Sequence, residues 1–118
     1  MISDFISVSA LSSLAVQQQV SANNLANVNT PGFNPSRVDL QTGPLDQGVQ
    51  VGAITQEDGQ LQETAAPTSP EGLNQIPSRT DLVQEMVKQI TTSTYFAANT
   101  KPIQTQNDML GSLINIFV

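Results

Sequence analysis

The sequence contains no cysteine and no histidine among its 118 residues. Without cysteine there are no disulfides and no thiol chemistry, and both reducing and oxidising compartments stay open. Without histidine the commonest general base and metal ligand is missing, so a zinc site would need carboxylates alone. The acids do not fill this gap, because Glu57 and Asp58 are neighbours on an expected turn and no acids have calcium-loop spacing. We therefore expect no enzyme, no cofactor, no metal and no small-molecule ligand.

Basic residues and long apolar runs are also scarce. Four basic residues stand against ten acidic ones, giving a net charge of −6. The four are scattered and form no stripe for a phosphate backbone, so nucleic-acid binding is not expected. No apolar run approaches the roughly 20 residues that span a bilayer. The first residues lack a basic segment followed by an apolar core, so no conventional secretory signal is expected.

The chain is poor in aromatic residues, at 4%, and its hydrophobic share is 38%. A well-filled solitary core is therefore doubtful for this single domain, residues 1–118. Glutamine and asparagine are abundant while charged residues make up 12%. This balance suits surfaces buried against neighbouring protein copies. An ordinary polar surface, or partial disorder of the isolated chain, stays open as an alternative.

Heptad spacing predicts a long helix at each end of the chain. Over residues 3–29 an apolar stripe steps alternately by three and four, a coiled-coil seam formed by Val8, Leu11, Ala15, Gln18, Ala22 and Leu25, with Leu14 beside it. Over residues 80–117 a second seam comprises Leu82, Met86, Gln89, Ser93, Phe96, Thr100, Ile103, Asn107, Leu110, Ile114 and Phe117. Thr80 or Ser78 can cap this helix, and Pro102 should kink or split it. Neither helix is expected to be stable without a partner.

The middle, residues 30–79, is predicted to be loops with a small β-hairpin. Alternation over residues 47–55 indicates a strand, Asp58-Gly59 a turn, and residues 61–64 a return strand. Residues 32–48 read as irregular, with a short extended piece at 37–40. The expected fold is mainly α (α+β), with the terminal helices paired as an antiparallel coiled coil. Residues expected to pack between the helices are Leu11, Leu14, Leu25, Leu82, Met86, Phe96, Ile103 and Leu110.

Residues 22–33, A-N-N-L-A-N-V-N-T-P-G-F, read as a helix end followed by a stop. Pro31 ends the helix, Gly32 can adopt a left-handed conformation, and Phe33 is an expected anchor. The string resembles the N-terminal signature of bacterial flagellar rod and hook proteins, A-N-N-(L/I)-A-N followed by T-(P/T)-G-(F/Y). Residues 81–90 (D-L-V-Q-E-M-V-K-Q-I), 95–99 (Y-F-A-A-N), 103–105 (I-Q-T) and 108–110 (D-M-L) are similar to the C-terminal signature of that family. The two resemblances cover about half of the chain.

The resemblance implies a structural subunit of the flagellar basal-body rod. Such subunits leave the cytoplasm through the flagellar type III export apparatus without a cleaved signal, and polymerise with other rod and hook subunits into a periplasmic axial tube that transmits torque and conducts exported subunits. The short middle is most like that of a short proximal-rod protein. Residues of the family motif, or expected at subunit contacts, are Asn23, Asn24, Asn27, Thr30, Pro31, Gly32, Phe33, Glu85, Tyr95 and Asn99. Tyr95 and Phe96 fit either packing between the helices or a contact with a neighbouring subunit.

A second reading is a flagellar or type III export adaptor or chaperone, an acidic and soluble helical hairpin. The acidic balance of the chain favours this reading slightly, whereas the rod signature argues against it. An adaptor would stay in the cytoplasm, so cell fractionation separates the two readings.

Overall fold

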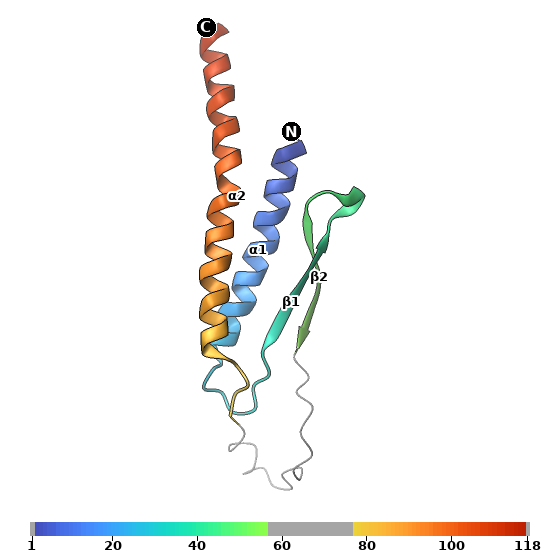
Figure 1. Ribbon diagram of the computed structural model, residues 1–118, viewed down its shortest axis with the longest axis vertical. Helices are drawn as coiled ribbons and strands as arrows, with labels where there is room; N and C mark the ends of the chain where they lie inside the picture. The colour runs from blue at the N-terminus through green and yellow to red at the C-terminus, as the bar shows by residue number, and fades with distance from the viewer. Residues whose placement is uncertain (1, 57–76, 118) are drawn as a thin grey trace.

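The computed structural model describes residues 2–56 and 77–117. The elements in chain order are α1 (Ile2–Ala26), β1 (Ser36–Thr42), a 3-10 turn η1 (Pro44–Asp46), β2 (Val49–Gln56) and α2 (Leu82–Phe117). The two helices run side by side in opposite directions, and the β1–β2 hairpin lies along the side of α1 that faces away from α2 (Figure 1). The expected mainly α fold, with long terminal helices and a small antiparallel hairpin between them, is confirmed.

Helix α1 ends at Ala26, three residues earlier than the sequence predicts, because the chain tightens into turns. The Asn27 amide donates to the carbonyl oxygens of both Asn23 and Asn24 at 3.2 Å. A second turn follows, in which the Phe33 amide donates to the Thr30 carbonyl at 3.2 Å. Gly32 within this turn has φ +70°, the left-handed conformation that glycine adopts without strain.

The hairpin differs from the predicted one in its partner strand. Strand β2 lies where alternation predicted a strand, but it pairs antiparallel with β1 at 36–42, a stretch read as irregular apart from 37–40. Its tight connection closes with a hydrogen bond from the Gly43 amide to the Gly48 carbonyl at 3.1 Å. Leu45 and Asp46 there adopt positive φ values of 61° and 55°, a conformation that residue type alone does not announce. The expected turn at 58–59 and return strand at 61–64 lie outside the described residues.

Serine side chains of α1 hold the hairpin in place. The Ser13 hydroxyl donates to the Val49 carbonyl at 3.0 Å, and the Val49 amide donates to Ser9 Oγ at 3.2 Å. A Cβ on Gly48 would lie 2.3 Å from Ser9 Oγ and would displace this hydroxyl from its hydrogen bond to Val49, and the φ of +72° at Gly48 also favours glycine. A two-stranded sheet is marginal by itself, and here α1 supports it.

Helix α2 begins with Asp81 as its N-cap, whereas the sequence indicated Thr80 or Ser78. Asp81 Oδ1 accepts hydrogen bonds from the amides of Val83 at 2.9 Å and Gln84 at 3.1 Å, two donors that the first turn leaves free. Ser78 acts just before the helix begins, where its Oγ accepts a hydrogen bond from the Thr80 amide at 3.2 Å.

Helix α2 continues through Pro102 without splitting (Figure 1). Proline removes one backbone donor, which leaves the carbonyl of Ala98 without its helical partner. Both Ala98 and Pro102 are exposed, so water can hydrate that carbonyl.

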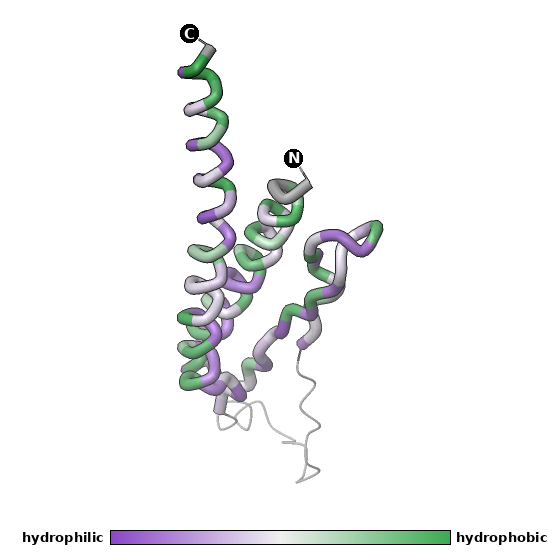
Figure 2. Tube along the Cα trace, turned by 45° about the horizontal axis from the view of Figure 1, so that its top comes forward, coloured by the Kyte–Doolittle hydropathy of each residue, from purple (hydrophilic) through white to green (hydrophobic). Residues whose placement is uncertain are grey.

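Few apolar side chains of the described residues are buried. The buried hydrophobic residues are Leu14 and Val38, each 8% exposed. The hydrogen bond from Ser21 of α1 to Glu85 of α2 joins the helices, and both side chains are buried. Figure 2 shows that hydrophobic positions of α2 gather toward its two ends, with a more hydrophilic middle. At 1.5 Å per residue, the 36 residues of α2 extend about 16 Å further than the 25 residues of α1.

Candidate functional site

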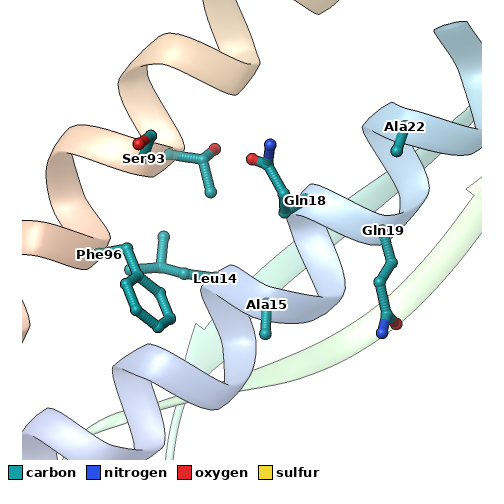
Figure 3. Close-up of a pocket in the computed structure, with 8 residues that line it drawn as sticks. Leu14, Ala15, Gln18, Gln19, Ala22, Ser93 and Phe96 are labelled. Atoms are coloured by element: carbon teal, nitrogen blue, oxygen red, sulfur yellow. The ribbon is translucent and has the colours of Figure 1, made fainter.

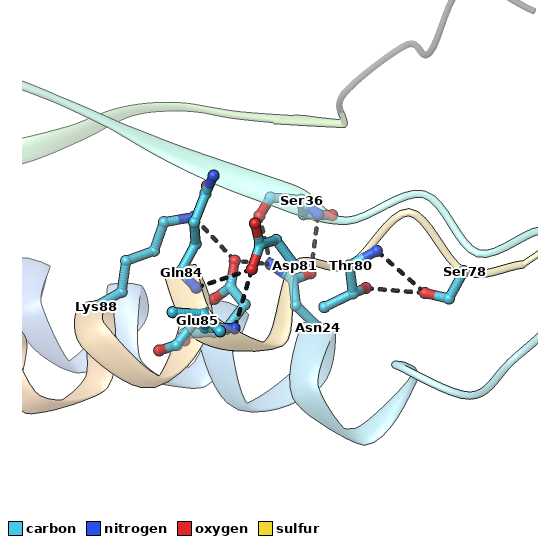
Figure 4. A network of polar contacts seen from close by, with 10 residues as sticks. Asn24, Ser36, Ser78, Thr80, Asp81, Gln84, Glu85 and Lys88 are labelled. Carbon is cyan, nitrogen blue, oxygen red and sulfur yellow. Dashed lines mark hydrogen bonds and ion pairs between the residues drawn. The ribbon is translucent and has the colours of Figure 1, made fainter.

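A buried polar junction joins both helices and the first strand (Figure 4). Glu85 of α2 is 4% exposed and accepts hydrogen bonds from Ser21 Oγ at 2.6 Å and Asn24 Nδ2 at 3.3 Å, both on α1. Lys88, one turn further along α2, donates to Glu85 Oε1 at 2.8 Å. Ser21 and Asn24 are three residues apart and therefore share one face of α1. We call Ser21, Asn24, Ser36, Glu85 and Lys88 the junction.

Asn24 uses its whole amide group and is 1% exposed. Its Nδ2 donates to the Ser36 carbonyl at 2.7 Å, and its Oδ1 accepts the Ser36 amide at 2.8 Å. The other N–H of Nδ2 reaches Glu85. An aspartate or a leucine could not supply this combination of two donors and one acceptor. Asn24 thus fixes the start of β1 to both helices.

The negative charge of the Glu85 carboxylate is stabilised within the junction. Burial by itself would raise the pKa of this carboxyl. The hydrogen bonds from Lys88 and Ser21, the positive charge of Lys88 and the hydrogen bond from Asn24 outweigh burial, so the pKa of Glu85 is lowered from its ordinary value of 4.5. The carboxylate therefore stays ionised at neutral pH and serves as an acceptor for donors from both helices.

The turn after α1 contains the other motif residues of the N-terminal half. Asn27 Nδ2 donates to the Asn23 carbonyl at 2.9 Å, and Thr30 Oγ1 donates to Asn27 Oδ1 at 3.1 Å. The half-buried Phe33 accepts the Arg79 amide at its carbonyl at 3.1 Å, which ties this turn to the segment before α2. Asn23, Pro31 and Gly32 are exposed. The asparagines of the motif thus divide between the junction and the helix end.

The residues expected to pack between the helices occupy different environments. Leu14 is buried, and Leu11, Leu25 and Ile103 are half-buried. The structure differs from the prediction for Leu82, Met86, Phe96 and Leu110, which are 45%, 52%, 42% and 57% exposed. Two properties of α2 explain this difference, namely its rotation about its own axis and its length. The buried residues of α2 are Glu85 and Thr92, one position before the expected seam at 86 and 93. Leu110 belongs to the C-terminal turns of α2, the longer helix, whose end extends past the start of α1 (Figure 1).

Large apolar side chains remain exposed along α2. They fall in two groups, one over 82–90 and one over 109–116, with the aromatic pair between them: Leu82, Val83, Met86, Val87, Ile90, Tyr95, Phe96, Met109, Leu110, Leu113, Ile114 and Ile116. Asn99 donates to the Tyr95 carbonyl of its own helix at 2.9 Å. Exposed apolar surface on this scale is typical of a protein that binds other protein surfaces.

Within residues 2–56 and 77–117, no three acidic side chains gather into a possible metal site. No helix in the same described ranges is long and apolar enough to cross a membrane.

Sequence reasoning missed Ser21, Ser36 and Lys88 as members of the junction. A weak signal existed for two of them. Ser21 stands three residues before Asn24, and Lys88 three after Glu85, the spacing of neighbours on a helix surface. Ser36 contributes only backbone atoms to Asn24, so no residue type could announce it.

The fold and its exposed surfaces together indicate a class of protein. Two long paired helices meet through a polar junction, few apolar residues of the described part are buried, and one helix exposes apolar side chains near both of its ends. These features are typical of a protein that binds other protein surfaces.

Comparison with protein families gives the class a name. Residues 6–34 match the family described as "Flagella basal body rod protein", and residues 78–116 match "Flagellar basal body rod FlgEFG protein C-terminal". Together the two matches cover more than half of the chain, with Asn24 in the first and Glu85 in the second. The chain belongs to the flagellar basal body rod and hook protein family, which confirms the resemblance, and its general role is structural. A comparison with curated proteins finds no match.

Proposed function

We propose that this chain is a subunit of the flagellar basal-body rod that polymerises, with copies of itself and other rod and hook subunits, into a helical axial tube. The tube transmits torque and conducts exported subunits. The observation that supports assembly most directly is the exposed apolar surface of α2, from Leu82 to Ile116. In an isolated chain such a surface would stay in contact with water, which is unfavourable, whereas a subunit packed on its neighbours buries it. A contact that joins different surfaces of successive copies generates an open helical polymer.

The proposal places the chain in the periplasmic part of the rod, after export through the flagellar type III apparatus without a cleaved signal. The brevity of the segment between the helices supports a short proximal-rod protein. Among the described residues, the hairpin of 36–56 is small compared with the two helices. The helices therefore supply most of the surface available for contacts with other subunits.

The test is a deletion of the gene in a flagellated strain that encodes it, complemented with a tagged full-length chain. We expect the deletion to abolish swimming, and the tagged chain to be recovered with isolated basal bodies. Leu25→Asp is expected to block incorporation, because Leu25 is a half-buried residue of α1 and a carboxylate there would be desolvated. Exposed Ser12→Asp on the same helix is the matched control and should be incorporated normally. Normal swimming of the Leu25→Asp strain would contradict the proposal.

An export adaptor or chaperone is the competing function, and the acidic balance of the chain is the observation in its favour. The same tagged strain distinguishes the two. An adaptor would stay in the cytoplasmic fraction and be absent from basal bodies, whereas a rod subunit would be found in them.

A further inference from the structure

An open groove of about 500 Å³ runs between α1 and α2 (Figure 3). Its walls include Ala15, Gln18 and Ala22 of α1 and Thr92, Ser93 and Phe96 of α2. None of the residues that line it is charged. The small side chains of Ala15, Ala22 and Ser93 leave room for the side chains of a third helix.

The heptad seams of the two helices both meet this groove. Ala15, Gln18 and Ala22 are three members of the α1 seam, and Ser93 and Phe96 are members of the α2 seam. The hydrogen bond between the helices instead uses Ser21 and Glu85, which are not seam positions. Leu82 and Met86, the exposed seam members at the start of α2, precede Ser93 by eleven and seven residues and so lie on its side of the helix. The seam members that line the groove therefore have space beside them for a further partner.

The character of the groove limits what can occupy it. Leu14 and Phe96 are among its lining residues, and no lining residue carries a charge. An occupant that fits must therefore be largely apolar and uncharged.

The far end of α2 has these properties. Residues 109–116 contain no charge, and Leu110, Leu113 and Ile114 are all more than half exposed. The segment cannot reach the groove of its own chain, because Leu113 is about 25 Å along the same helix from Phe96, one of the groove walls. Only a second copy can bring it there.

We propose that the groove between α1 and α2 binds the C-terminal turns of α2, residues 109–116, from a second copy of this chain. The contact rests on the proposed function and names one of its subunit contacts. It is a head-to-tail contact, since the groove and the inserted turns are different surfaces, and it repeats from copy to copy.

The absence of cysteine from the chain permits a direct test. Two full-length versions with different tags are expressed together in the flagellated strain, one with Ala15→Cys or Ala22→Cys in the groove and the other with Leu110→Cys. Isolated basal bodies are oxidised mildly, and disulfide-linked pairs with both tags are measured. The matched control replaces the groove cysteine with Gln50→Cys, an exposed position on the hairpin.

We expect a two-tag pair with Ala15→Cys or Ala22→Cys at several times the level found with Gln50→Cys. If both tagged chains are present in the basal bodies and neither groove variant exceeds this control, the groove contact is wrong and the proposed function survives. If neither tagged chain is present in basal bodies, the proposed function fails and the groove contact fails with it.

Discussion

Replacing Glu85 with alanine tests whether the junction holds the two helices together. The variant removes the carboxylate acceptor of Ser21 Oγ and of one N–H of Asn24, both on buried residues. Ser21 Oγ keeps the main-chain oxygen of residue 85 as an acceptor at 3.4 Å, whereas the Asn24 N–H loses its partner. A buried donor left without an acceptor costs about 1–3 kcal/mol, and the ion pair with the half-exposed Lys88 adds at most about 1 kcal/mol. We therefore expect Glu85→Ala to lower the free energy of unfolding by about 1–4 kcal/mol.

The assay is urea unfolding of the purified full-length chain, followed by far-ultraviolet circular dichroism. Gln84→Ala, at the exposed neighbouring position, is the control and should stay within about 0.5 kcal/mol of the wild type. Glu85→Gln should give a smaller loss than Glu85→Ala, because the amide keeps an oxygen for Ser21 or Asn24 but cannot match the charge of Lys88. A Glu85→Ala variant as stable as Gln84→Ala would refute the role assigned to the junction.

Three further predictions follow from the same contacts. Asn24→Ala should cost about 2–3 kcal/mol, and hydrogen exchange at the Ser36 amide should accelerate, because that amide loses its acceptor. The lowered pKa of Glu85 means that its contribution is full above the ordinary value of 4.5 and is lost as pH falls through the folded-state value, so the difference in urea midpoint between wild type and Glu85→Gln should shrink in acid. Gly32→Ala should destabilise the chain by about 1–2 kcal/mol through its positive φ, whereas Gly111→Ala, in an equally open position inside a helix, should raise helix content and stabilise it by up to about 1 kcal/mol; circular dichroism during thermal unfolding measures both.

The long-range plan of the molecule could be predicted because helix spacing is a local property of the sequence. The steps of three and four placed a helix at each end, and alternation at Val49 and Val51 placed β2. The pairing of β2 with β1 could not be predicted, because the connection between them has Leu45 and Asp46 in left-handed conformations. Glycine or asparagine normally occupies such positions.

The junction could be predicted only in part, because hydrogen bonds between distant segments leave little trace in sequence spacing. Asn24 and Glu85 were identified as motif residues, but their contact joins positions 61 residues apart. The helix seams were identified too, yet the sequence could not show that they meet at a groove. A heptad stripe shows which face of a helix meets a partner, but it does not show how many partners share that face.

The most direct measurement of the central claim is electron cryomicroscopy of basal bodies from the complemented strain, with the tag on the chain labelled by antibody and the rod map compared with the helix pair. The account predicts label on the rod, and density there that fits α1 paired with α2. Basal bodies with an intact rod but without label, together with tagged chain in the cytoplasm, would contradict the account and establish the adaptor reading in its place.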